Sequence, residues 1–476
     1  MTRTAIAFAG TASLGVLAAT PVAAQQVSQT PAGSSVSGIG QLQEVLVTAR
    51  RREERLQSVP IAITAYSGEQ LRTRNIDSQS DLAINTPSLV NNASGFPSEL
   101  GGSQSFAIRG QGPAYGAVPG TVVYFADVPD LSFAGIDGRR GTYFDMQSVQ
   151  VLKGPQGTLF GKNATGGNVL FQPQKPVDDF DGYAQIQLGD FRDRAFEGAL
   201  NVPIVRDRVL FRIAGSAERR AGYTTDVGPY FSGKDYDNVD YETVRASLVV
   251  RPTDDIESYT ILRYYREDDH GPGTVLIAFN PNASQGPFTV GNYFPNWALL
   301  LAQQQARGPR QVSYNLDEFV TSRNWQAINT TSWEAGDWLT IKNIASYASD
   351  RTRYGYDYDA TPDPIAGQLT TNGWTNAIDS WTEELQFQGK VLNRALDYTA
   401  GVYGDKFYPG ENQTFEADYF PVSTVLLGGQ LLPVLADNQQ ARSRAAYAQG
   451  TYDFSGLAPF LKGLSATAGY RFTSDD

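Results

Sequence analysis

The densest motif of the chain is LKGPQGTLFGKNATGG, residues 152–167. Glycine at this density permits positive φ angles and close approach of backbone segments, so the motif predicts a compact, loop-rich fold. A phosphate-binding loop would need glycine at Gln156 and serine or threonine at Asn163, so the spacing excludes that site. Together with one glycine upstream, the candidate motif residues are Gly110, Gly154, Pro155, Gly157, Gly161, Asn163, Gly166 and Gly167.

A second glycine-rich stretch, residues 110–116, also fails as a nucleotide site. Its glycines miss the dinucleotide fingerprint by one position, and Pro113 stands where a helix would have to begin. Around both stretches, short β-branched or aromatic segments alternate with turn residues. Residues 68–87 read as one or two short helices that stop at Pro87. We therefore expect a compact, glycine-rich α+β domain over residues 56–175.

The composition excludes several kinds of chemistry. The 476 residues include 47 Gly and 25 Tyr, but no Cys and a single histidine, His270. Disulfides, thiolate metal sites and nucleophile-histidine pairs therefore lack their residues, and we expect no catalytic, metal or cofactor site. The net charge of −12 has the wrong sign for a surface that follows phosphates, which argues against nucleic acid as a partner.

The N-terminus reads as an export signal. Arg3 precedes an apolar stretch over residues 5–19, and small residues up to Ala24 suit cleavage, so residues 1–24 are predicted to be a signal peptide. The rest of residues 25–55 is predicted to form a periplasmic tether. Its first part, residues 27–43, is rich in Ser, Gly and Gln and cannot bury enough apolar surface to fold alone.

A short apolar peptide, EVLVTA at residues 44–49, ends the tether. A β-branched segment on a mobile leader suits strand addition to the sheet edge of another protein. It suits the first strand of the following domain equally well, and composition does not decide between the two. The next residues, Arg50 to Arg52, are followed by two glutamates, which favours a solvated linker.

The order of motifs resembles a known family. EVLVTA, VPIAITAYSGEQL, FAIRG, VYFADVP and DMQSVQVLKGPQGTLFGKNATGGNV follow one another between residues 44 and about 173. This order is similar to the plug region of TonB-dependent outer-membrane receptors. The resemblance implies that the peptide is the TonB box, formed by Glu44, Val45, Leu46, Val47, Thr48 and Ala49.

The same resemblance implies partners and a way to seat the plug. The TonB box would pair with the periplasmic protein TonB, which connects to an energising complex in the inner membrane. Arg109 and Lys153 match positions where the family carries two basic residues held by barrel glutamates. Lysine at position 153 departs from the usual arginine and can make point-charge contacts but not bidentate ones.

The remaining chain can be tested for a membrane β-barrel without the family. No apolar run reaches the 18 or so residues of a membrane helix, whereas barrel strands alternate between apolar and polar residues. Phe196, Gly198 and Leu200, for example, alternate with polar or small neighbours. We predict eleven such strands, near residues 183–188, 194–202, 208–218, 240–250, 256–267, 320–333, 338–348, 379–389, 396–406, 443–453 and 463–472.

The connections between these segments alternate in length. After the first hairpin, short connections separate the long ones, which cover about 219–239, 268–319, 349–378 and 407–442. A soluble sandwich has no reason to place every long loop at one end, whereas an outer-membrane barrel has short periplasmic turns and long external loops. The pattern therefore predicts a transmembrane antiparallel barrel over residues 180–476.

Aromatic residues of the plug and the long loops are candidates for ligand contact, and the alternative is an interface girdle together with ordinary loop packing. Glu383 and Glu384 are adjacent and point to opposite faces of a strand, so they cannot form an acid-base pair by themselves. One of them is expected to face the lumen, toward a basic residue of the plug. The candidate ligand residues are Tyr115, Phe133, Trp297, Tyr354, Tyr356 and Trp374.

Bacterial single-chain barrels have an even number of strands, and the resemblance implies 22, so residues 180–476 hold about half of one. The sequence is expected to be partial. The leading hypothesis is energy-coupled uptake, through the outer membrane, of a scarce external ligand such as a ferric siderophore. Cobalamin, haem, glycans and aromatic compounds are alternatives, and a passive porin or an adhesin barrel is the rival from another class.

Overall fold

A computed structural model of the chain describes residues 46–92, 105–112, 120–130, 139–282, 284–285, 288–289, 296–336, 338–364, 367–370, 373–411, 416–419, 432–434 and 440–476. No helix within these ranges is long and apolar enough to cross a membrane. Residues 46–173 form a small domain that we call the plug. The residues that follow form a large antiparallel sheet, which we call the wall.

The plug is built on a five-stranded sheet in the order β3-β8-β9-β6-β7. Strands β6 and β9 are parallel and the other pairs are antiparallel. Nearly every residue of β8 is buried, because this strand lies inside the sheet and is covered on both faces. The strands are β3 (Ala62–Ser67), β6 (Thr121–Phe125), β7 (Val128–Pro129), β8 (Met146–Lys153) and β9 (Gly167–Pro173).

Short helices complete the plug, as the sequence predicts. Ser67 and Gln70 form a reciprocal capping box at the start of α1, and Ser78 caps α2. Leu71 and Leu82 face the plug core, together with Val149 and Phe171. The remaining elements are α1 (Gly68–Thr73), α2 (Gln79–Asn85), α3 (Gly157–Phe160), the 3-10 turn η1 (Leu56–Ser58), and the pairs β1 (Leu46–Val47) with β2 (Glu54–Arg55) and β4 (Leu89–Asn92) with β5 (Ser105–Ile108).

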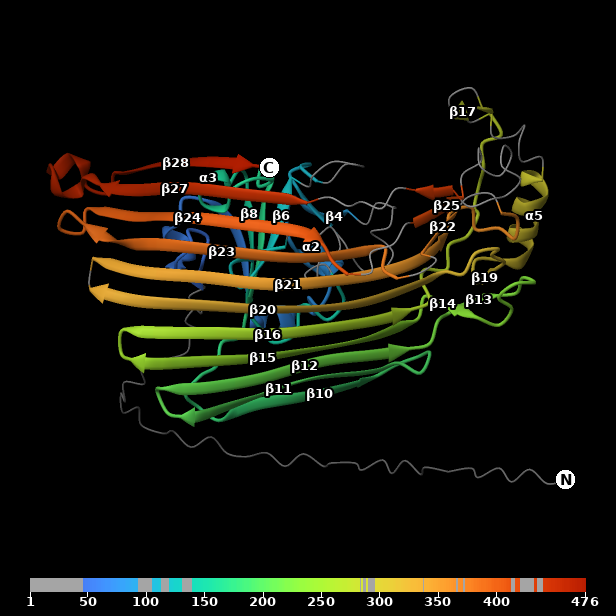
Figure 1. Cartoon of the computed structure of the whole chain (residues 1–476), viewed down its shortest axis with the longest axis horizontal. Coiled ribbons are helices and arrows are strands. Elements are labelled where there is room, and N and C mark those ends of the chain that lie inside the picture. Colours follow the sequence, from blue (N-terminus) through green and yellow to red (C-terminus); the bar gives the residue numbers. More distant parts are fainter. Residues whose placement is uncertain are drawn as a thin grey trace, which may run out of the picture. The chain divides into compact units, whose positions relative to one another are not determined.

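Eleven strands run side by side in the wall and follow the order of the sequence (Figure 1). Each of the eleven predicted segments overlaps one of them, so the strand prediction is confirmed. The strands are β10 (Asp181–Leu188), β11 (Arg194–Val205), β12 (Val209–Arg220), β15 (Val239–Thr253), β16 (Ile256–Asp269), β20 (Phe319–Gly336), β21 (Leu339–Asp357), β23 (Asn376–Val391), β24 (Leu396–Pro409), β27 (Ala441–Asp453) and β28 (Ser465–Asp475).

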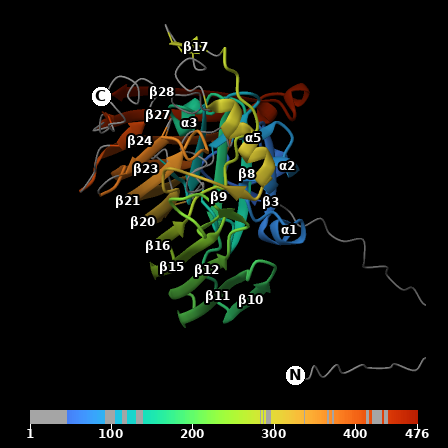
Figure 2. The same ribbon diagram turned by 90° about the vertical axis from the view of Figure 1, so that its right-hand side faces the viewer.

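The two faces of the wall differ in chemistry. One face carries exposed apolar and aromatic side chains, among them Phe196, Leu262 and Trp325. The alternate residues are polar but buried, among them Arg212, Asn324 and Gln386, because the plug packs against them. Figure 2 shows the plug strands β3, β8 and β9 on one side of the wall. This arrangement, apolar outside and polar inside, is that of a membrane barrel rather than of a soluble sheet.

The long connections gather at one end of the wall, as the alternating lengths predict (Figure 1). They contain β13 (Thr224–Asp226), β14 (Asp235–Tyr236), β19 (Gln311–Val312), β22 (Gly367–Thr370), β25 (Glu416–Tyr419) and β26 (Leu432–Val434), with β17 (Ser284–Gln285) and β18 (Phe288–Thr289) in a further pair. The short turn between β27 and β28 contains η3 (Phe454–Gly456) and η4 (Pro459–Leu461).

A helix inside one long connection was not predicted. The sequence predicts one long connection over residues 268–319, but Trp297–Arg307 form α5. Alanine, leucine and glutamine fill this segment and favour a helix, which ends at Gly308 with a φ of 84°. The prediction followed strand periodicity and so overlooked a local helical preference.

Candidate functional site

The predicted TonB box lies at the start of what we call the coupling segment, residues 46–55. Leu46 and Val47 pair antiparallel with Glu54 and Arg55, so the segment is a small hairpin. Val47 and Ala49 are completely buried among apolar residues of the plug. Glu44 and Val45 lie outside the described residues. In this structure the peptide is therefore part of its own domain, as one of the two interpretations expected, and its pairing with TonB stays a prediction.

Polar contacts fix the backbone of the coupling segment. The Thr48 amide donates a hydrogen bond to the Gln150 side chain at 2.9 Å. The Gln172 side chain donates to the Thr48 hydroxyl at 3.1 Å. Both glutamines belong to the central plug strands β8 and β9, so movement of the segment would act directly on the plug sheet.

Arg51 connects the coupling segment to the wall. Its side chain is 2% exposed, and its guanidinium lies 3.5 Å from the Glu384 carboxylate of β23. The same group lies 4.3 Å from the centre of the Phe160 ring and donates to the Asp127 carbonyl at 2.8 Å. Burial alone lowers the pKa of Arg51, but the charges around it, led by Glu384, raise the pKa above its ordinary value. Arg51 therefore remains ionised in a buried ion pair.

The neighbouring arginines reach two more strands. Arg50 donates to the Thr451 hydroxyl of β27 at 3.1 Å, and Arg52 pairs with Asp397 of β24. The interpretation of residues 50–52 as a solvated linker was therefore wrong, and residues 46–55 of the predicted tether are packed instead. A single sequence does not reveal the acidic wall partners of Arg51 and Arg52, because Glu384 and Asp397 are more than 300 positions away.

Glu384 confirms the expectation drawn from the adjacent glutamates. Its side chain is buried on the plug side of β23 and receives a hydrogen bond from the Tyr447 hydroxyl as well as the Arg51 contact. Glu383 lies on the opposite face and is exposed, with the Asn343 side chain donating to it at 3.3 Å. Strand alternation alone separates the two roles.

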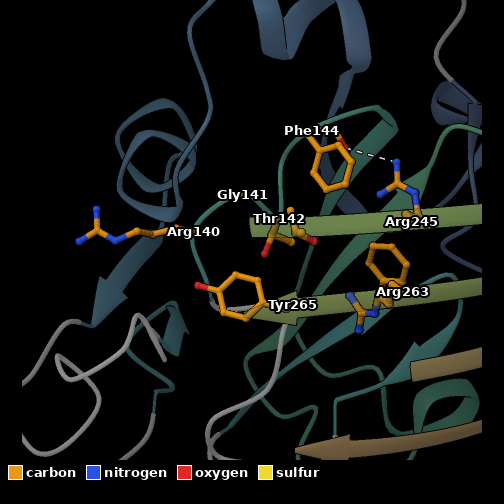
Figure 3. A pocket seen from close by; sticks show the side chains of 9 residues that line it. Arg140, Gly141, Thr142, Phe144, Arg245, Arg263 and Tyr265 are labelled. Atoms are coloured by element: carbon orange, nitrogen blue, oxygen red, sulfur yellow. Dashed lines mark hydrogen bonds between the residues drawn. The ribbon is translucent and has the colours of Figure 1, made fainter. Parts of the chain in front are cut away.

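A second anchor holds the other edge of the plug. The Asp145 carboxylate accepts hydrogen bonds from Arg212 of β12 and, at 3.0 Å, from Arg245 of β15. Arg245 also donates to the Phe144 carbonyl at 3.4 Å, beside a cavity of about 10 Å³ between plug and wall (Figure 3). One plug carboxylate therefore compensates two buried wall arginines, an anchor that sequence reasoning missed.

The predicted lock residues are not paired in this way. Arg109 is exposed with a φ of 53°, and its guanidinium lies near the backbone of Gly154. Partial burial, followed by the charge of Arg109, lowers the pKa of Lys153. Neither residue forms an ion pair within the described part of the chain. The glutamate lock at Arg109 and Lys153 therefore stays a prediction.

The glycine motif forms the tight connections between β8, α3 and β9. A side chain at Gly166 would bring its Cβ to 2.6 Å from the Gln111 side chain, so only glycine fits there. Gly167 pairs with Lys153 at a φ of 141°, which a larger residue rarely adopts. The motif is thus needed for close backbone approach, as the sequence predicts. Asn163 and Gly161 also adopt positive φ.

Four of the six predicted ligand residues lie in the described part of the chain. Tyr115 and Phe133 lie outside the described residues. Trp297 is buried and stacks on Phe279 with ring centres 5.5 Å apart, and Tyr354 is 2% exposed. Tyr356 stacks edge-on against Tyr358, and Trp374 lies beside arginines of β20 and β21. Packing accounts for the positions of Trp297 and Tyr354, and ligand contact stays a prediction for the set.

Asp127 gives the plug a pH dependence. Its carboxylate lies 2.8 Å from the Lys342 ammonium of β21. Although burial raises the pKa of Asp127, Lys342 and Arg51 together hold this pKa below its ordinary value. A carboxyl whose pKa is depressed in the folded state stabilises that state when the pH is above its unfolded pKa of about 3.9. This stabilisation is lost as the pH falls through the pKa of the folded state.

We expect Asp127→Asn to lower plug stability at neutral pH by about 1 kcal/mol. Asparagine tolerates the φ of 69° at this position, so the backbone is not the cause. Denaturant unfolding at several pH values measures the effect. The variant should lose less stability than the wild type on acidification below about pH 4, and equal losses would contradict the assignment.

The external connections form a layer of their own. Strand β13 pairs with β14 and, in parallel, with β19. We call this three-stranded sheet and its apolar core the loop layer. The core consists of Tyr236, Val312, Tyr314 and Ala360. At its base, the Glu318 side chain is completely buried and accepts a hydrogen bond from the Asp357 amide at 3.2 Å. Burial, and then the charge of Asp357, raises the pKa of Glu318 well above its ordinary value.

We expect Glu318→Gln to stabilise the loop layer at neutral pH by about 1 kcal/mol. Because the pKa of Glu318 is raised in the folded state, folding keeps its carboxyl protonated. The folded state therefore loses stability as the pH rises above the pKa of the unfolded chain, about 4.3. Glutamine keeps the acceptor and has no proton to lose. Limited proteolysis of the external loops at mildly acidic and neutral pH tests this, and an unchanged pH dependence would refute it.

Comparison with known proteins supports the architecture. Residues 55–168 match the TonB-dependent Receptor Plug Domain family. The pesticin receptor of Yersinia pestis is 30% identical over 146 residues, which cover 30% of this chain and 20% of that protein. The pesticin receptor of Yersinia enterocolitica is 40% identical over 67 residues, 14% of this chain and 9% of that protein.

Two solved structures share the fold. The ferric yersiniabactin uptake receptor FyuA of Yersinia pestis superposes with a TM-score of 0.63 at 17% identity, over 87% of this chain and 56% of that one. The ferric-catecholate import receptor Fiu of E. coli K12, in its open form, superposes with a TM-score of 0.60 at 14% identity, over 89% of this chain and 60% of that one. The chain spans little more than half the length of these structures. Residues 55–168 therefore belong to the TonB-dependent receptor plug family, and the wall that follows matches half of a receptor barrel.

Proposed function

We propose that this chain acts in TonB-dependent uptake of a ferric siderophore across the bacterial outer membrane. The observation that carries the proposal is the coupling segment. It begins within the predicted TonB box and forms hydrogen bonds to the central plug strands. Its three arginines, Arg50 to Arg52, contact three wall strands. A pull on residues 44–49 would therefore load the plug sheet and its anchors in turn.

The packing of the plug argues against the passive rivals. Its side chains bury the polar inner face of the wall, from Arg212 on β12 to Glu384 on β23. A porin needs an open lumen, and an adhesin needs no domain inside the wall. An element that fills the lumen and is held by buried ion pairs requires work to move it, which the energised TonB system would supply.

The ligand class is supported by the similar proteins rather than by a formed site. The solved structures that match the chain include receptors for ferric yersiniabactin and ferric catecholates. The ligands of these receptors favour an iron-siderophore complex over cobalamin, haem, glycans or aromatic compounds. The outer-membrane location proposed here rests on the family, on the apolar outward face and on the signal peptide predicted for residues 1–24, which lies outside the described residues.

Uptake in living cells tests the proposal. Iron-limited cells that carry the protein should accumulate labelled iron from a ferric catecholate or a ferric yersiniabactin-type complex, and a protonophore or loss of TonB should abolish the accumulation. Labelled cobalamin and haem serve as parallel substrates and should not accumulate. Uptake that persists without energy would support the porin alternative and overturn the proposal.

A further inference from the structure

The outward face of the wall carries an unusual pair of cations near the external loops. Arg323 of β20 and Arg353 of β21 are both exposed. Arg323 lies opposite Arg351, and Arg353 lies opposite Thr321, in the antiparallel pairing of the two strands. Alternation then places both arginines on the same face as Trp325, pointing away from the plug.

One aromatic ring brings the two guanidinium groups together. The Trp374 ring centre lies 5.9 Å from the guanidinium carbon of Arg323 and 5.9 Å from that of Arg353. Arg353 also lies 5.9 Å from the Phe319 ring. Stacking on an aromatic face orients a guanidinium while leaving its N–H edge free to bind.

Neither arginine has an acidic partner in the described part of the chain. Other outward-facing arginines differ: Arg266, which lies opposite Arg323, is 3.3 Å from Asp268, and Arg219 of β12 is 3.3 Å from Asp240. Two uncompensated guanidinium groups on a protein with a net charge of −12 leave a local positive site on the surface. A ligand that completes this site must be anionic.

The position of the pair indicates where that ligand lies. Tyr264 and Trp325 are cross-strand partners one step further from the loops, and Leu262 and Tyr347 follow beyond them on the same face. Aromatic residues of this kind mark the boundary between headgroups and acyl chains in membrane barrels. Arg323 and Arg353 therefore stand at headgroup depth on the external side.

We propose that Arg323, Trp374 and Arg353 bind a phosphate group in the headgroup of an outer-leaflet lipid, whose acyl chains lie along the apolar surface beside Trp325 and Tyr347. The guanidinium forks match phosphate oxygens in geometry and charge. The inference requires that the outward face meets lipid, but it is independent of TonB coupling and of the transported ligand.

The test compares two double variants in lipid nanodiscs. The protein is placed in phosphatidylcholine nanodiscs that contain either bisphosphorylated lipid A or its dephosphorylated form, and bound lipid is quantified by native mass spectrometry. Arg323→Ala with Arg353→Ala should weaken binding of the phosphorylated lipid at least about tenfold. Arg208→Ala with Arg219→Ala removes the same charge from arginines that pair with Asp254 and Asp240, and should change binding no more than about twofold.

Further arms separate the alternatives. The dephosphorylated lipid should bind wild type and variants alike, and inorganic phosphate in solution should not displace the lipid. Equal losses in the two double variants, equal binding of both lipids, or full displacement by inorganic phosphate would each overturn the proposal. If the alanine pair fails to fold, Arg323→Lys with Arg353→Lys keeps the charge and should still weaken binding measurably, because lysine lacks the planar fork; unchanged binding would count against the site.

Discussion

Leu46→Pro should reduce energy-dependent uptake at least about tenfold while ligand binding to the same protein stays unchanged. Strand addition relies on main-chain hydrogen bonds, and proline both lacks the N–H and restricts the backbone. Losing one or two such bonds at about 1 kcal/mol each is enough for this effect. Uptake of labelled ferric siderophore in energised cells and binding at low temperature in de-energised cells measure the two quantities separately.

Leu46→Ala is the matched control for this prediction. It shortens the side chain but keeps the N–H, so uptake should stay within about twofold of the wild type if the backbone carries the interaction. If Leu46→Pro and Leu46→Ala impair uptake equally, uptake depends on the Leu46 side chain and not on main-chain strand pairing. If proline leaves uptake intact, residues 44–49 are not the TonB box.

Glu384→Gln should cost about 3–5 kcal/mol of plug stability. The change leaves the Arg51 guanidinium, which is 2% exposed, without its carboxylate and removes the charged acceptor of the Tyr447 hydroxyl. An uncompensated buried charge is far more costly than a lost surface contact. Denaturant unfolding and hydrogen exchange of residues 46–55 measure the loss, and exchange there should speed up more than in the wall strands.

Glu383→Gln provides the control at the adjacent position. Glu383 lies on the exposed face of the same strand, so its neutralisation should cost no more than about 1 kcal/mol. A double-mutant cycle with Arg51→Met should give a coupling energy of at least about 1 kcal/mol between positions 51 and 384. Equal costs at 383 and 384, or additive effects in the cycle, would show that the contact does not hold the coupling segment.

The strands of the wall could be predicted from sequence because their signal is local. Alternation at Phe196, Gly198 and Leu200 reports which side of one strand is apolar, and it needs no knowledge of the neighbouring strands. The loop lengths add the direction in which each strand runs. The helix α5 escaped this approach, since its leucines and glutamines lie in a connection where only strands were sought.

The site was predicted only in part. The role of EVLVTA as TonB box is implied by the family resemblance alone and stays a prediction, whereas the Glu383 and Glu384 pair correctly indicated one lumen-facing acid. The sequence suggests that Glu53 and Glu54 neutralise the charge of Arg51. In the structure Glu54 forms ion pairs with Arg50 and Arg52 instead, and Arg51 points inward to Glu384. Neighbours in sequence do not reveal which charge is buried.

The sequence by itself determined the class of fold: a glycine-rich plug domain followed by alternating strands with an apolar outer face. These features follow from turn chemistry and a two-residue period, which act within a few positions. Only the tertiary structure decided how the plug is held. The Arg51 carbonyl and Gln388, 337 positions apart, meet because strand register and plug docking bring them together. Asp145 likewise compensates Arg212 and Arg245 from two different strands. Such contacts depend on how separate elements pack, and no local pattern in the chain encodes them.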